Sequence, residues 1–261
     1  MAVVWLGVLL FYDMRSGRMI LREAHHSSHR GTVCAPVWDW KVLRKLAWLA
    51  APLGVVMMLN SLNANIPRYV VEHHLGQWEL GIFAALAYLQ LAENTVVTAL
   101  GQSATPRLAA NFAQKRTSAF RGLNVRLVAI GLAIGGTGVL MALLFGHWLL
   151  TLLYRPEYAA YSSVFVWLMI GAALSNVAAF LGYGLTAARC FHVQMTLLVA
   201  ESLVLCGTCL YLIPKYNLMG AAVAYVIAKG FLIALSALAL AREMRRARRV
   251  NSVAEGCVDV G

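Results

Sequence analysis

The stretch "NSLNANIPRYVVEHHLGQWELGIF", residues 60–83, places three asparagines, an arginine and a proline between two strongly apolar segments. The whole chain is 61% hydrophobic and 13% charged, with a mean hydropathy of +0.69. A soluble domain of 261 residues could not bury this much apolar surface. The composition therefore predicts an integral membrane protein, in which irregular polar backbone must be covered by protein or water.

Six apolar runs are long enough to cross a hydrocarbon core of roughly 30 Å, which takes about 20 helical residues. They cover residues 43–62, 80–100, 127–150, 164–185, 195–213 and 218–240. A shorter run, Ala2 to Tyr12, lacks the basic start and the cleavage site of a signal peptide, so we interpret it as the end of another helix. We therefore predict an all-α polytopic membrane protein, a bundle of about six to seven transmembrane helices.

The basic residues alternate between the connecting segments. Of the 22 lysines and arginines, all but Arg68, Arg155, Lys215 and Lys229 fall on one side of an up-and-down path. Because such residues favour cytoplasmic loops, we predict a cytoplasmic C-terminus, with six crossings or with seven that start outside. The net charge of +11 then needs no nucleic-acid partner, and membrane lipids with anionic headgroups are the expected contact.

These patterns predict four parts along the chain. They are a partial or truncated transmembrane helix at 1–12, a basic cytoplasmic loop at 13–41, a six-helix transmembrane lobe at 42–240 and a basic cytoplasmic tail at 241–261. Within the lobe, prolines are expected where helices start or stop. Those marking such boundaries are Pro67, Pro106, Pro156 and Pro214.

No residue pattern typical of an enzyme is present. Cys206 and Cys209 form a CxxC in the middle of an apolar span, without the second pair that a zinc site needs. His25, His26 and His29 fall in the predicted basic loop, where a solvated loop is the favoured interpretation over a weak metal site. We expect no catalytic residues, no metal and no cofactor.

Polar side chains recur along the second full span. Gln90, Asn94, Thr98 and Gln102 are spaced by four residues, and Glu93 lies beside them. This spacing keeps the groups near one helical face, which cannot favour lipid. The stripe either bonds neighbouring helices together or lines a transport cavity, and five polar groups favour the cavity.

Other polar residues fall inside or at the ends of spans. Asn60 and Asn63 are expected on one helix face, and Arg68 follows at a break that we place at Pro67, near a cavity mouth. Glu201 and Lys229, in neighbouring spans, could form an intramembrane ion pair. That pair is either structural or part of a coupling-ion or substrate site.

One glycine pair predicts close helix packing. Gly131 and Gly135 form a GxxxG pattern in the third full span. Small residues at this spacing let membrane helices approach closely. We assign this pair a packing role.

Several segments together resemble a known family. The segments are "NIPRYVVEHHLGQWELGIFAALAYL" at 65–89, "ALGQSATPRLAANFA" at 99–113, "GYGLTAARCFHVQ" at 182–194 and "LIPKYNLMGAAVAYVIAKG" at 212–230. They resemble the bacterial polysaccharide (O-antigen type) flippases of the multidrug/oligosaccharidyl-lipid/polysaccharide exporter superfamily. The resemblance covers only the C-terminal part of that family, its second lobe and the helix before it.

The resemblance implies a function at the cytoplasmic (inner) membrane. The protein would flip undecaprenyl-diphosphate-linked oligosaccharides to the outer leaflet for surface polysaccharide such as lipopolysaccharide O-antigen. Arg68, Lys229 and the polar stripe could contact the headgroup. A cation-coupled multidrug exporter and a non-transporting scaffold that binds polysaccharide assembly proteins are the alternatives. Because half of a two-lobe carrier is missing, we expect a truncated or split protein that works with a second lobe or as a homodimer.

Overall fold

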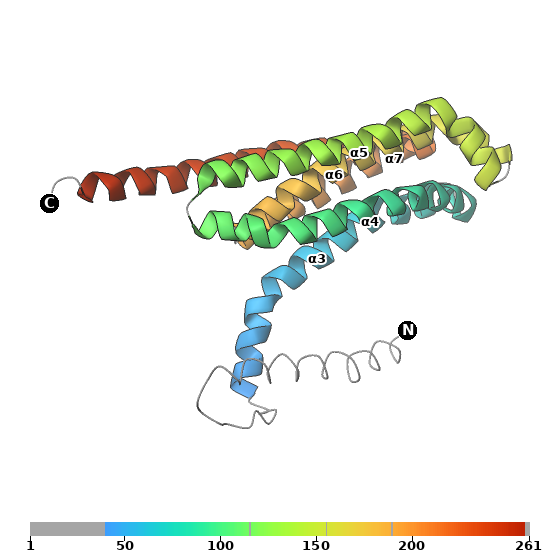
Figure 1. Cartoon of the computed structure of the whole chain (residues 1–261). Helices are drawn as coiled ribbons and strands as arrows, with labels where there is room; N and C mark the ends of the chain where they lie inside the picture. The colour runs from blue at the N-terminus through green and yellow to red at the C-terminus, as the bar shows by residue number, and fades with distance from the viewer. Residues whose placement is uncertain (1–39, 115, 155, 189, 259–261) are drawn as a thin grey trace, which may run out of the picture. The chain divides into compact units, whose positions relative to one another are not determined.

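Helices make up every element in the described part of the chain (Figure 1). The computed structural model describes residues 40–114, 116–154, 156–188 and 190–258. In chain order the elements are α3 (Trp40–Leu75), α4 (Gln77–Ala113), α5 (Thr117–Leu153), the 3-10 helix η2 (Pro156–Tyr161), α6 (Ser162–Ala187) and α7 (Phe191–Val258). The all-α fold class predicted from the sequence is therefore confirmed.

The chain divides into two units, Met1–Ala47 and Trp48–Gly261. In the first unit, only the start of α3 belongs to the described residues. The predicted helix at 1–12 and all of the basic loop before residue 40 lie outside them. The second unit contains the helices that build the site, and the bounds predicted for the lobe and tail stay predictions.

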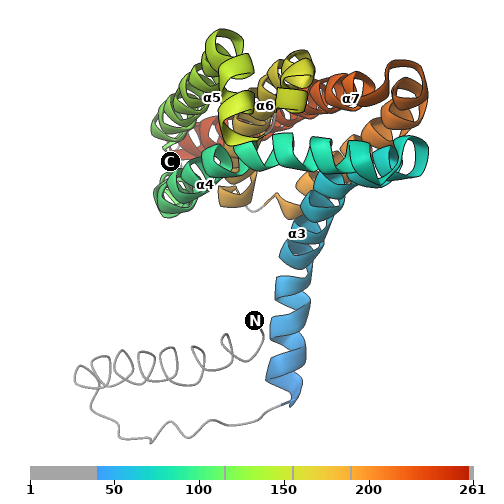
Figure 2. The same cartoon turned by 90° about the vertical axis from the view of Figure 1, so that its right-hand side faces the viewer.

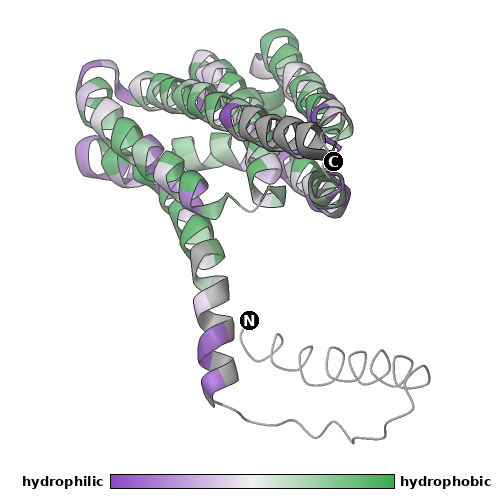
Figure 3. Cartoon of the chain, turned by 90° about the vertical axis from the view of Figure 1, so that its left-hand side faces the viewer, coloured by the Kyte–Doolittle hydropathy of each residue, from purple (hydrophilic) through white to green (hydrophobic). Residues whose placement is uncertain are grey.

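Four helical segments in the described residues are long and apolar enough to cross a membrane. They are Gln77–Ala113, Ser118–Leu153, Glu157–Ala187 and Phe191–Arg242. Hydrophobic residues dominate the middles of these helices, and hydrophilic ones gather toward their ends (Figure 3). Large apolar side chains also face outward, with Leu144 73% and Leu203 70% exposed. A multi-pass membrane protein accounts for this exposure, because lipid tails solvate such side chains.

α7 combines two of the predicted spans. Its helix is interrupted at Asn217, where φ is 52° and ψ is −136°. The chain folds back there, so that a first arm before Asn217 and a second arm after it lie close together (Figure 2). A Cβ atom at Gly220 would collide with the carbonyl of Leu212, so this close return requires glycine.

Prolines mark helix boundaries less often than predicted. Pro156 begins η2 and Pro214 lies three residues before the break at Asn217, as expected, but Pro106 lies inside α4. The predicted break at Pro67 is also wrong, because α3 continues to Leu75 and ends before Gly76, whose φ is 91°.

The turns after Pro67 explain why α3 continues. A proline inside a helix costs about 3 kcal/mol. Val71 is fully buried, and Ile66, Val70 and Leu75 pack against the same cluster. Each such side chain contributes roughly 1.5–3 kcal/mol when it is fully buried. This packing offsets the proline, which sequence spacing alone could not reveal.

Small residues let α5 approach α6 closely. A Cβ atom at Gly131 would lie 2.7 Å from Cδ2 of Phe180. At Gly135, a Cβ atom would overlap the backbone Cα of Ala173. The packing role predicted for this glycine pair is therefore confirmed.

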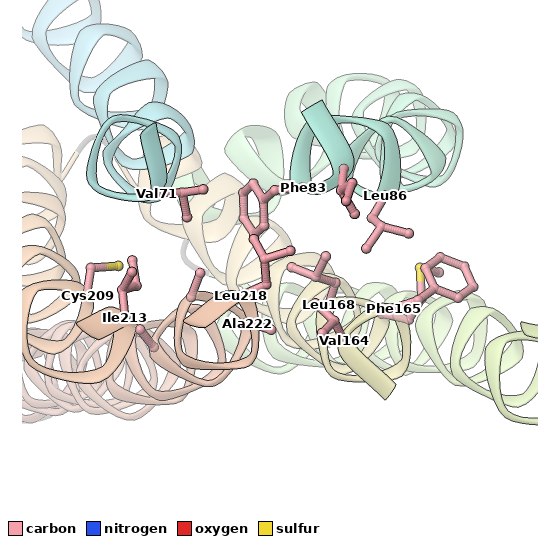
Figure 4. Close-up of a cluster of buried hydrophobic side chains, with 14 of the residues drawn as sticks. Val71, Phe83, Leu86, Val164, Phe165, Leu168, Cys209, Ile213, Leu218 and Ala222 are labelled. Atoms are coloured by element: carbon pink, nitrogen blue, oxygen red, sulfur yellow. The ribbon is translucent and has the colours of Figure 1, made fainter. Parts of the chain in front are cut away.

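The main core cluster joins α3, α4, α5, α6 and both arms of α7, and Figure 4 shows part of it. Val71 of α3 and Phe83 of α4 point into the space between the helices, where Leu168 of α6 and Ile213 and Leu218 of α7 belong to the same cluster (Figure 4). All five side chains are at most 4% exposed. This cluster fixes the helices whose polar residues form the candidate site.

Candidate functional site

A cavity of about 180 Å³ lies among α3, α4, α6 and the second arm of α7. Its apolar wall includes Phe83 and Leu168 of the core cluster. Its polar wall comes from four helices and consists of Arg68, Tyr88, Gln90, Asn94, Ser175, Asn176 and Tyr225. The cavity is therefore partly polar in a segment of the chain that is otherwise strongly apolar.

Only part of the predicted α4 stripe reaches this cavity. Gln90 and Asn94 line it, whereas Thr98 and Gln102 do not. Gln90 donates from Nε2 to the backbone carbonyl of Leu168 at 2.7 Å, which ties α4 to α6. Asn94 is exposed and forms no side-chain hydrogen bond within the described residues. The α4 stripe thus combines a helix contact with an open cavity wall.

Glu93 lies between α4, α5 and α6, directly behind the cavity wall. Its Oε1 accepts a hydrogen bond from Nδ2 of Asn176, which is buried and also lines the cavity. Its Oε2 is buried and has no hydrogen-bond partner within the described residues. A Cβ atom at Gly138 would lie 3.2 Å from this oxygen, so α5 passes close to the carboxyl group. Glu93 bonds helices and borders the cavity at the same time.

On α3, the polar residues separate into different environments. Arg68 lines the cavity, and its Nη1 lies 3.5 Å from Oδ1 of Asn65, which is a long contact. Asn60 does not line the cavity, because it is exposed and donates from Nδ2 to Val56 of its own helix at 2.9 Å. The structure therefore keeps Arg68 in the cavity and places Asn60 outside it.

Asn63 joins a buried network with α7 and does not line the cavity. Its Nδ2 donates to Oε2 of Glu201 at 3.0 Å, and its Oδ1 accepts from Oγ of Ser202 at 2.6 Å. Nζ of Lys229, on the second arm, lies 2.6 Å from Oε1 of Glu201. Glu201 is fully buried and Lys229 is 8% exposed. The structure brings these three residues together behind the cavity, not into its wall.

Three polar residues of the cavity wall were not found by sequence reasoning. Tyr88, Ser175 and Tyr225 line the cavity, but none of them stands out in an apolar span. The available signals were local: Ser175 precedes Asn176, and Tyr225 lies one helical turn before Lys229.

In the described part of the chain, no three His, Cys, Asp or Glu residues come together as a metal site. Cys206 and Cys209 are free thiols, and Cys209 packs in the main core cluster. The histidines at 25, 26 and 29 lie outside the described residues. The groups present at the cavity can bind by hydrogen bonding and charge.

Comparison with solved structures shows the fold class. The chain superimposes on an outward-facing multidrug resistance MATE family transporter of the MOP superfamily with a TM-score of 0.60 and 12% identity. That match covers 94% of this chain and 54% of the transporter. The crystal structure of a MATE mutant matches with the same TM-score and identity over 53% of its length. The chain therefore has the MATE transporter fold over about half of such a transporter.

Comparison by sequence adds a curated relative. The chain is 30% identical over 181 residues to the capsular polysaccharide biosynthesis protein CapF of Staphylococcus aureus. The match covers 69% of this chain and 46% of CapF, so the chain spans about half the length of this relative. No protein-family model matches the chain.

Proposed function

We propose that the chain acts as a lobe of a membrane exporter that flips polyprenyl-diphosphate-linked oligosaccharides across the cytoplasmic membrane. The product would supply surface polysaccharide biosynthesis. The observation that carries this proposal is the cavity, where a guanidinium group stands beside amide and hydroxyl groups. The similarity to a capsular polysaccharide biosynthesis protein supports the same substrate class.

The free polar groups of the cavity suit a charged, hydroxylated headgroup. Asn94, Ser175 and Tyr225 form no side-chain hydrogen bonds with described residues, and Arg68 makes only the long contact with Asn65. A guanidinium group binds phosphate oxygens by charge-assisted hydrogen bonds, which are roughly twice as strong as neutral ones. Amides and hydroxyls both donate to and accept from sugar hydroxyls. The polyprenyl tail can remain in lipid while the headgroup occupies the cavity.

The cavity is smaller than the usual pocket for a drug-sized ligand. Pockets for drug-sized ligands usually measure about 300–1,000 Å³. The cavity here, at about 180 Å³, is smaller. A ligand of either candidate class would therefore extend beyond it.

A cation-coupled multidrug exporter is the second candidate function. The observation in its favour is that the structural neighbours are multidrug transporters. Efflux of a cationic dye that depends on a sodium or proton gradient would favour this candidate. A lipid-linked substrate predicts no such efflux. Both candidates are transporters, and neither requires enzymatic chemistry.

The proposed function also requires a defined orientation in the membrane and a second lobe. The basic residues favour a multi-pass arrangement with a cytoplasmic C-terminus. Alternating access moves one helical repeat against another around a shared site, so we infer that a second lobe or a second copy of the chain completes the path. Polysaccharide assembly proteins are further candidate partners, and the scaffold hypothesis would leave the chain bound to them without transport.

Complementation tests the proposal. The chain would be expressed in a host that lacks its own polysaccharide flippase, alone and with a five-helix N-terminal half of a related flippase. Surface polysaccharide would be scored after membrane insertion is verified. Rescue by the chain alone would indicate a complete path, and rescue only with the added half would indicate a split carrier. Absence of rescue in both cases would contradict flipping and favour a scaffold.

A matched pair of variants links the rescue to the cavity. Asn94→Leu removes a cavity amide, whereas Thr95→Val changes the next residue, which is exposed, does not line the cavity and bonds to Leu91 of its own helix. We expect the first variant to impair rescue and the second to retain it. Equal rescue by both would remove the cavity from the transport path.

A further inference from the structure

Tyr225 is held in the cavity wall by two contacts. Gly171 of α6 allows the ring to approach, because a Cβ atom there would overlap ring atom Cδ1 and lie 2.9 Å from Cε1. In addition, Nζ of Lys229, on the same arm of α7, lies 5.4 Å from the ring centroid. This distance is within the range of a cation–π interaction, and the four-residue spacing places both side chains on one helical face.

The ammonium group that contacts Tyr225 is itself fixed. Lys229 is 8% exposed, and its Nζ lies 2.6 Å from Oε1 of the fully buried Glu201. The other carboxylate oxygen accepts from Nδ2 of Asn63 at 3.0 Å. Charge and hydrogen bonding therefore connect Tyr225 to the first arm of α7 and to α3.

The hydroxyl of Tyr225 is available for a ligand. Tyr225 lines the cavity together with Arg68, Asn94 and Ser175. The residue is half-buried, and its hydroxyl forms no hydrogen bond with any described residue. The ring is held in place while its polar end remains unused.

We propose that Tyr225 is a ligand-contacting residue that hydrogen-bonds a sugar hydroxyl, and that the Glu201–Lys229 pair is its positioning element. The guanidinium group of Arg68, in the same cavity, binds the diphosphate next to that sugar. This inference rests on the proposed function and names the part of the headgroup that each side chain recognises. The ion pair then affects ligand binding through Tyr225, without contacting the ligand.

Two labelled probes test this assignment on the full chain in lipid nanodiscs. One is farnesyl diphosphate, and the other is farnesyl diphosphate linked to N-acetylglucosamine. We expect Tyr225→Phe to weaken binding of the sugar-bearing probe about five-fold, the effect of one lost neutral hydrogen bond. Binding of farnesyl diphosphate should stay unchanged. Arg68→Ala should weaken binding of both probes.

The positioning role has its own test. Glu201→Gln combined with Lys229→Gln removes both charges, so that no unpaired buried charge threatens folding. We expect the same five-fold loss for the sugar-bearing probe and no further loss in a Tyr225→Phe background, because both changes act through one contact. The single change Lys229→Arg keeps the positive charge and should retain binding. Gly171→Ala should displace the ring and weaken sugar binding, whereas Gly230→Ala, which has open space, should not.

Each outcome has a defined meaning. Unchanged binding of the sugar-bearing probe by Tyr225→Phe overturns the inference while the proposed function stands. Equal loss for both probes in the charge-free variant would show that the pair only maintains structure, which overturns its positioning role. If neither probe binds the parent chain, the proposed function fails and the inference fails with it.

Discussion

Nζ of Lys229 lies 2.6 Å from Oε1 of Glu201, and the pair connects the two arms of α7 at a place where Glu201 is fully buried. Taking two charges out of water and into a protein interior is costly, so such pairs are sensitive to the loss of one partner. The pair also receives a hydrogen bond from Asn63 of α3. Three helical segments therefore depend on one buried charge pair.

Lys229→Met should destabilise the protein strongly. It leaves the carboxylate of Glu201 buried without a counterion, which costs about 3–5 kcal/mol. Glu201→Gln combined with Lys229→Gln should cost less, because no charge remains unpaired. Thermal unfolding in detergent measures both variants. Equal midpoints for the parent and Lys229→Met would contradict the buried pair.

Neighbouring glycines of α5 should respond with opposite signs. Gly135→Ala places a Cβ atom onto the backbone of Ala173, which cannot move aside, and overpacking of this kind costs about 1–3 kcal/mol. Gly136→Ala meets nothing within 4 Å and should stabilise α5 by up to about 1 kcal/mol through helix propensity. The free energy of unfolding in detergent separates them. Equal effects would mean that α5 and α6 are not in close contact there.

The turn between the arms of α7 predicts a stabilising substitution. Asn217 has a φ of 52°, a conformation that costs residues other than glycine roughly 1–3 kcal/mol. Asn217→Gly should therefore stabilise the protein by about 1 kcal/mol, and Asn217→Val should destabilise it. Tyr216→Gly, in the adjoining helical residue, should instead cost about 1 kcal/mol. Thermal unfolding checks the order, and stabilisation by Asn217→Val would refute the turn geometry.

Glu93→Gln should reduce transport while leaving membrane insertion intact. The amide oxygen can still accept from Asn176, so α4 and α6 remain bonded, but the buried Oε2 is replaced by a donor that has no acceptor. Transport would be scored by rescue of surface polysaccharide. Glu157→Gln, at an exposed residue of η2, serves as the control. Rescue equal to that of the parent would remove Glu93 from the transport path.

The sequence predicted the architecture better than it predicted the site. Hydropathy over long windows located the helices, because lipid allows only internally bonded backbone to span it. The proline signals failed at Pro67 and Pro106, where both helices continue. At Pro67 the reason is burial of the following turns, in which Val71 is fully inaccessible to solvent. Local chemistry cannot report such long-range packing.

The sequence predicted only some of the residues that form the site. Spacing placed Gln90 and Asn94 on one face, and both line the cavity. It could not show that Thr98 and Gln102 fall outside the cavity, or that Asn63 turns toward Glu201. Helical periodicity defines a face of one helix, whereas its neighbour depends on how the helices pack.

By itself, the sequence determined that the chain is a bundle of apolar helices with polar groups inside its spans, because composition and periodicity act locally along the chain. It also predicted Glu201 and Lys229 as a possible ion pair, which the structure contains. Only the tertiary structure decided the other polar contacts: it placed Glu93 against Asn176, and Arg68, Asn94 and Tyr225 around a shared cavity. These contacts join residues far apart in the sequence, so they depend on close approach between helices that glycines and buried side chains permit.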